Sequence, residues 1–181
     1  MLKEFTSATL VIGAVNGRAT IAAAKKLFVS VHSRFRKWGL DRAGEPTPET
    51  KVNIYESRET ATFVQMCESV PHEEIDDLCL TQAQIDEFCE KNRHSFTVTT
   101  LFLFKKKINP LKRVLRWLVK LIFRREIKRR IFVAVMRPCY ETPDRVSIRA
   151  EVEHFESTTV WGGYHPYRLV VRVADVATIA A

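Results

Sequence analysis

Four segments rich in β-branched and aromatic residues constrain the fold most strongly. They span 96–104, 131–136, 145–155 and 168–173. In the third segment apolar and polar residues alternate, which is typical of a strand with one buried face. Complementary charges on the outward faces of the third and fourth segments favour their pairing as an antiparallel hairpin. The sequence therefore predicts an α+β fold: a mainly antiparallel sheet of about four strands with helices on one side.

The N-terminal region carries an apolar pattern at helical spacing. Ile21, Ala24, Phe28, Val31, Phe35 and Trp38 form this pattern. It predicts an amphipathic helix that Gly39 ends in a left-handed conformation. Gly44, Pro46 and Pro48 mark a linker after this helix. We therefore expect a helical N-terminal arm over 1–39, a linker over 40–53 and an α+β domain over 54–181.

A second helix is predicted beside an acidic stretch. Thr81 followed by Gln84 is a capping box, and it opens a helix through about Lys91 with Ile85 and Phe88 facing inward. The stretch 73–90 contains seven acidic residues with no Lys or Arg among them: Glu73, Glu74, Asp76, Asp77, Asp86, Glu87 and Glu90.

The positive charge is concentrated in one segment. Lys105–Arg130 contains 12 Lys and Arg residues against one acid, Glu126, whereas the rest of the chain has 17 basic and 20 acidic residues. This basic segment lies between the first and second predicted strands. A connection of this length between paired strands indicates a function or a docking role.

The basic segment has the pattern of an amphipathic helix. Pro110 is suited to a first helical turn, and the pattern continues to about Arg124. At 1.5 Å per residue this helix is about 21 Å long, too short to cross a bilayer. Its predicted apolar docking face consists of Leu115, Trp117, Leu118 and Ile122. Its predicted polyanion-binding residues, with those of the tail that follows, are Lys112, Arg113, Arg116, Lys120, Arg124, Arg125, Lys128, Arg129 and Arg130.

Three interpretations of this helix are open. It packs on the protein's own sheet with a solvated basic face, it lies on an anionic membrane surface, or it contacts the phosphates of nucleic acid. The wide apolar face favours a membrane or a protein over DNA. The acidic stretch 73–90 is an internal partner that could mask the basic helix, although surface ion pairs contribute only about 0–1 kcal/mol each to such docking.

A loop near the C-terminus gathers aromatic residues beside two glycines. Trp161, Tyr164, His165 and Tyr167 form a candidate partner-binding loop. Aromatic side chains on a loop stack on bases, rings or a protein partner, and they equally well fold back to cover the end of a sheet.

No motif indicates an enzyme, a cofactor or a metal site. Residues 13–20 resemble a phosphate loop only faintly, because three residues instead of four separate the glycines and Arg18 stands where Lys is needed. The four cysteines lack zinc-site spacing, which predicts reduced, buried thiols. Lys3, Glu4 and Asn16 argue against a signal peptide, so we expect an intracellular protein that is not secreted.

These observations predict a non-enzymatic adaptor that docks through the basic helix on a membrane surface or nucleic acid. The alternative is a structural subunit of a larger assembly or homo-oligomer, in which the arm and the inserted helix pack on neighbouring subunits. No small-molecule substrate is evident from the sequence.

Overall fold

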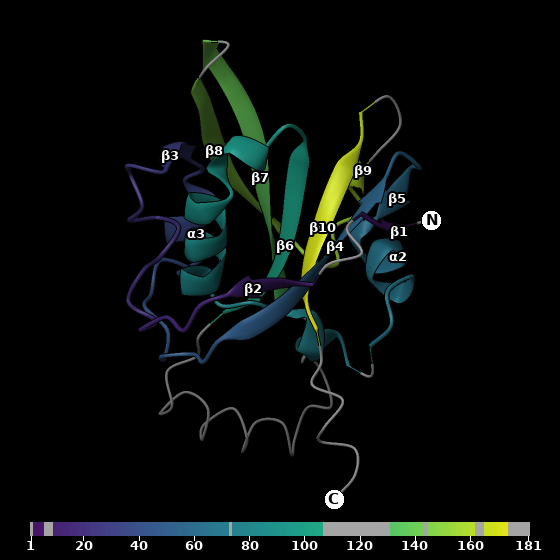
Figure 1. Ribbon diagram of the computed structural model, residues 1–181, viewed down its shortest axis with the longest axis horizontal. Helices are drawn as coiled ribbons and strands as arrows, with labels where there is room; N and C mark the ends of the chain where they lie inside the picture. The colour runs from purple at the N-terminus through teal and green to yellow at the C-terminus, as the bar shows by residue number, and fades with distance from the viewer. Residues whose placement is uncertain are drawn as a thin grey trace, which may run out of the picture.

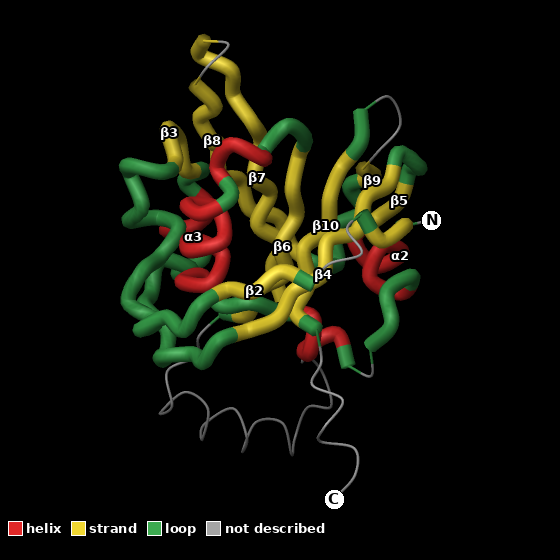
Figure 2. Tube along the Cα trace, in the orientation of Figure 1, coloured by secondary structure: helices red, strands yellow, loops and turns green. Residues whose placement is uncertain are grey.

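A computed structural model describes residues 2–5, 9–72, 74–106, 131–142, 145–161 and 165–173. Strands dominate these residues, and the helices are short (Figure 2). The strands are β1 (Lys3–Glu4), β2 (Leu10–Ile12), β3 (Phe28–Val31), β4 (Thr50–Ser57), β5 (Ala61–Thr62), β6 (Thr99–Lys105), β7 (Ile131–Thr142), β8 (Arg145–His154), β9 (Val160–Trp161) and β10 (Tyr167–Arg172). The helices are α1 (Arg34–Lys37), α2 (Phe63–Glu68) and α3 (Gln82–Lys91), with 3-10 turns η1 (Ile75–Leu78) and η2 (Arg93–Ser95).

Among the described residues, eight strands form one mixed sheet. Its order is β1-β4-β10-β6-β7-β8-β3, with β2 also paired to β4, while β5 and β9 form a separate pair. The prediction of a mainly antiparallel sheet of about four strands is therefore wrong. The four predicted strands exist as β6, β7, β8 and β10, but strands from the first 57 residues extend the sheet at both ends.

The predicted pairing of the third and fourth segments is also wrong. β8 pairs with β7 and β3, whereas β10 lies between β4 and β6 and runs parallel to β6. Charge complementarity between outward faces does not select a partner when strands from elsewhere in the chain compete for the same edge. The outward charges of β10 and β4 meet instead, with Arg168 Nε 2.9 Å from Glu56 Oε2.

The helical N-terminal arm is likewise contradicted. Residues 28–31 form β3, which pairs in parallel with β8, and among the described residues of the arm only 34–37 form a helix. The stop at Gly39 is confirmed: its φ is +62°, and Leu40 N donates to Phe35 O at 2.7 Å. The residues predicted to face inward do pack on the core, with Ile21, Phe28 and Phe35 buried. The apolar spacing thus identified the buried side of the segment but not its backbone conformation.

The sheet separates two hydrophobic cores. Alternation along β6 sends Phe102 and Phe104 to one face and Leu101 and Leu103 to the other. The first face is covered by α3 and by the segment from Ile21 to Leu40, and the second by α2 and η1 (Figure 1). Helices therefore cover both faces of the sheet instead of one. Burial on both faces explains why β6 is apolar without interruption from Leu101 to Phe104.

The capping box at Thr81 is confirmed. Thr81 Oγ1 accepts from Gln84 N at 3.2 Å, and Gln84 Oε1 accepts from Thr81 N at 2.9 Å. Ile85 and Phe88 face inward as predicted. Within the described parts of the chain, none of the helices has the length and apolar character needed to cross a membrane.

Candidate functional site: a cationic cleft at the base of the basic segment

The basic segment leaves and re-enters the sheet at one place. Lys105, the last residue of β6, is paired directly with Ile131, the first residue of β7. The segment is thus an insertion in an antiparallel pair, as predicted. The predicted helix, with its polyanion-binding residues from Lys112 to Arg130 and its apolar docking face from Leu115 to Ile122, lies outside the described residues.

Two lysines anchor the start of the insertion. Lys105 Nζ lies 2.7 Å from Asp76 Oδ2 on η1, and Lys106 Nζ donates to the carbonyl oxygen of Trp38. The acidic stretch therefore contacts the basic segment at its root, through Asp76. The Trp38 contact places the basic residues that end α1 next to the insertion.

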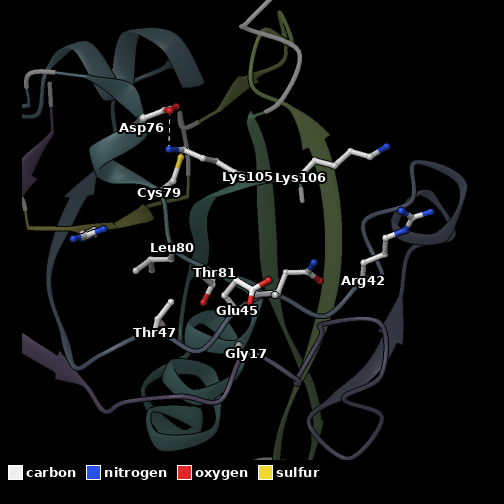
Figure 3. A pocket seen from close by; sticks show the side chains of 14 residues that line it. Gly17, Arg42, Glu45, Thr47, Asp76, Cys79, Leu80, Thr81, Lys105 and Lys106 are labelled. Carbon is white, nitrogen blue, oxygen red and sulfur yellow. Dashed lines mark ion pairs between the residues drawn. The ribbon is translucent and has the colours of Figure 1, made fainter. Parts of the chain in front are cut away.

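A cleft of about 330 Å³ opens at this root. Five parts of the chain build its walls: Gly17, the loop from Arg42 to Thr47, the η1–α3 junction, the end of β6 and the end of β10. Figure 3 shows the Lys105–Asp76 ion pair on one side of the cleft and Arg42 on the other. The described charged residues that line it are Arg42, Lys105, Lys106 and Arg172, with Glu45 and Asp76. The cations outnumber the acids by two.

The helix α3 begins in the wall of this cleft. Thr81, Gln82 and Ala83 all line it. The Gln82 side chain holds the N-terminal segment there, because its Nε2 donates to Leu40 O at 2.5 Å and its Oε1 accepts from Ile21 N at 3.3 Å. The partial positive charge of a helix N-terminus adds to that of the cations.

A close backbone contact shapes the opposite wall. Gly44 N donates to Gly17 O at 2.7 Å, and Val15 and Thr47 exchange backbone hydrogen bonds of 2.9 and 3.0 Å. Gly17 has a φ of +74°, and a Cβ there would lie 2.2 Å from Glu45 O, so only glycine fits. Thr47 Oγ1 is buried and has no hydrogen-bond partner among the described residues.

The thiols are placed for packing. Cys67, Cys79 and Cys89 are buried and unpaired, as predicted, and Cys139 is half-buried. Burial raises the pKa of Cys79, which lines the cleft, to about 12, and it raises the pKa of Cys67 and Cys89 strongly. A thiol with so high a pKa stays protonated at neutral pH and is a poor nucleophile. Within the described ranges, no group of His, Cys, Asp and Glu side chains is arranged to hold a metal ion.

The aromatic loop is split between core and surface. Tyr167 is buried and its hydroxyl donates to Glu59 O at 3.1 Å, while Trp161 packs on Phe63 with 5.4 Å between ring centroids. The guanidinium group of Arg137 lies over the Trp161 ring, 5.0 Å from the ring centroid. His165 is exposed, and Tyr164 lies outside the described residues.

The sequence pointed to the basic segment but missed most of the cleft. The loop after α1 contributes Arg42 and Thr47, and the end of β10 contributes Arg172. Whether these two elements lie side by side depends on the order of strands in the sheet. Among the cleft residues, Gly17 had the clearest sequence signal of a special backbone conformation, because Asn16-Gly17 is a turn-forming pair.

No family model, curated protein or solved structure matches this chain.

Proposed function

We propose that this protein is a non-enzymatic adaptor that docks on an anionic membrane surface through the basic segment Lys105–Arg130. The observation that carries the proposal is the pairing of Lys105 with Ile131. It means that the segment with 12 Lys and Arg residues starts and ends at one point of the sheet, beside two further cations in the cleft wall, Arg42 and Arg172. A dense basic group of this kind attracts anionic lipid headgroups at about 1 kcal/mol per Lys or Arg.

The choice of a membrane over nucleic acid rests on the predicted apolar face. Leu115, Leu118 and Ile122 gain free energy when they enter the apolar boundary of a bilayer, whereas nucleic acid offers them little to bury against. In this proposal the protein is intracellular and associates with the membrane peripherally.

Co-sedimentation with vesicles tests the proposal. Vesicles containing phosphatidylserine should sediment the wild-type protein, and the variant Lys112→Glu/Arg116→Glu/Lys120→Glu/Arg124→Glu should stay in solution. A matched control, Lys25→Glu/Lys26→Glu/Arg58→Glu/Arg149→Glu, makes the same charge change at four exposed positions elsewhere and should still sediment.

A parallel gel shift with mixed DNA and RNA separates the alternatives. Binding to nucleic acid alone, abolished by added salt, would replace the membrane with a phosphate backbone as the target. Binding to neither, by a protein that runs as a monodisperse oligomer, would favour the second candidate, a structural subunit whose inserted segment packs on its neighbours.

A further inference from the structure

We propose that the cleft at the base of the basic segment binds the phosphate group of a small phosphorylated ligand. This site is distinct from the predicted helix, because it shares only Lys105 and Lys106, at the root, with the basic segment Lys105–Arg130. Its chemistry follows from three features that meet in the cleft: flexible cations on the rim, a helix N-terminus and a buried hydroxyl.

The rim supplies guanidinium groups from two distant elements. Arg42 comes from the loop after α1, and Arg172 ends β10; both are exposed and line the cleft. Planar guanidinium groups match two phosphate oxygens at once, which makes Arg the usual partner of phosphate. Lys106 adds a third cation, and its hydrogen bond to the neutral Trp38 carbonyl leaves its charge uncompensated by that contact.

The acidic residues in the lining reduce this charge without cancelling it. Asp76 is paired with Lys105 at 2.7 Å, so these two side chains largely neutralise each other. The remaining charged residues of the lining are one acid, Glu45, and three cations, Arg42, Lys106 and Arg172. The remaining balance is positive by two charges, which matches a phosphate dianion.

The first turn of α3 supplies donors at the wall. Thr81 Oγ1 accepts from the amide of Gln84, so the cap satisfies the third amide of the helix. The amides of Gln82 and Ala83 precede it, and amides at the start of a helix have no intrahelical acceptor. Helix N-termini bind phosphate for this reason and because of the helix dipole.

Thr47 is an independent indication of a ligand. Its hydroxyl is buried in the cleft wall and no described group accepts from it or donates to it. A buried hydroxyl without a partner costs about 1–3 kcal/mol, and a rotation of this side chain toward the cleft would let a phosphate oxygen accept its hydrogen bond.

The size of the cleft limits the ligand. About 330 Å³ lies near the lower end of the range for small-molecule sites, which is about 300–1,000 Å³. A phosphate with an attached group the size of a sugar or glycerol fits that volume. The same phosphate monoester could come from a free metabolite or from a lipid headgroup.

Isothermal titration calorimetry of the full chain tests the site. The probes are inorganic phosphate and glycerol phosphate, which should bind the wild-type protein. Arg42→Ala/Arg172→Ala should weaken binding at least tenfold, and Thr47→Val should weaken it severalfold. Arg58→Ala/Arg149→Ala, which removes two exposed arginines elsewhere, should leave binding unchanged. All four substituted arginines are exposed, so thermal unfolding should be unaltered.

The charge-reversed basic segment separates this inference from the proposed function. The Lys112/Arg116/Lys120/Arg124→Glu variant should retain phosphate binding even if it loses vesicles. Absence of phosphate binding in the wild type, equal affinity in the two arginine double variants, or loss of phosphate binding in the charge-reversed variant would each overturn the cleft as the site.

Vesicles containing phosphatidic acid, a lipid with a phosphate monoester, distinguish the two ligand sources. If Arg42→Ala/Arg172→Ala weakens binding to these vesicles but not to phosphatidylserine vesicles, the ligand is a lipid headgroup. If that variant loses only the soluble probes, the ligand is a free phosphorylated molecule.

Discussion

The carboxyl group of Asp86 should make the stability of this protein depend on pH. Asp86 lies on α3, and its Oδ1 is buried with no hydrogen-bond partner among the described residues. Burial, with the nearby charges of Glu90 and Glu87, raises its pKa from 3.8 to about 6. The folded state therefore holds this proton more tightly than the unfolded state does. Stability from this group is present at low pH and is lost as the pH rises through the window from 3.8 to about 6.

The size of the effect follows from the pKa. Each pKa unit corresponds to a little over 1 kcal/mol, so the full difference bounds the effect at about 3 kcal/mol. Asp86 is only half-buried, and solvent screening reduces the expected value to about 1–2 kcal/mol. Asp86→Asn removes the charge with little change in shape. We expect this variant to be more stable than the wild type by about that amount at about pH 8, and by much less at about pH 4.

Urea unfolding at the two pH values measures this difference. The matched control is Glu90→Gln, which removes an exposed carboxylate from the same helix and should stabilise by less than about 0.5 kcal/mol. If Asp86→Asn is no more stable than the wild type at about pH 8, or if its advantage is the same at both pH values, the charge of Asp86 does not lower the free energy of unfolding as proposed.

Two further substitutions test the packing. Gly17→Ala should destabilise by about 2–3 kcal/mol in urea unfolding, because φ is +74° and the new Cβ would lie 2.2 Å from Glu45 O; Gly13→Ala, where the nearest atom is 3.6 Å away, should change little, and equal effects at the two sites would contradict the reasoning. Phe102→Ala should lower the free energy of unfolding by about 3–5 kcal/mol, since the side chain is fully buried; a loss no greater than that of the exposed Val29→Ala would show that this core does not hold the fold.

Local signals predicted the parts of the fold that depend on neighbouring residues. The capping box of Thr81 and Gln84 placed the start of α3, and Gly39 ended α1, because both act through hydrogen bonds that span a few residues. The apolar character of β6 and β7 likewise identified buried strands. These features do not require knowledge of what the segment packs against.

The segment from Ile21 to Trp38 shows where local reasoning stops. Ile21, Phe28 and Phe35 are seven residues apart, a spacing that fits one face of a helix. The same spacing arises when a turn, the strand β3 and the short helix α1 each direct one large side chain to the same core. Pairing of β3 with β8 decides between these conformations, and that pairing joins residues more than 100 positions apart.

The candidate site likewise has one part that the sequence predicts and another that only the tertiary structure shows. The sequence by itself determined that a dense basic segment interrupts a pair of strands, because charge and strand pattern can be read along the chain. The tertiary structure decided that β10 lies between β4 and β6, which brings Arg172 to the cleft that Arg42 and α3 also line. Strand order depends on how distant side chains fill two cores at once, and no local pattern carries that information.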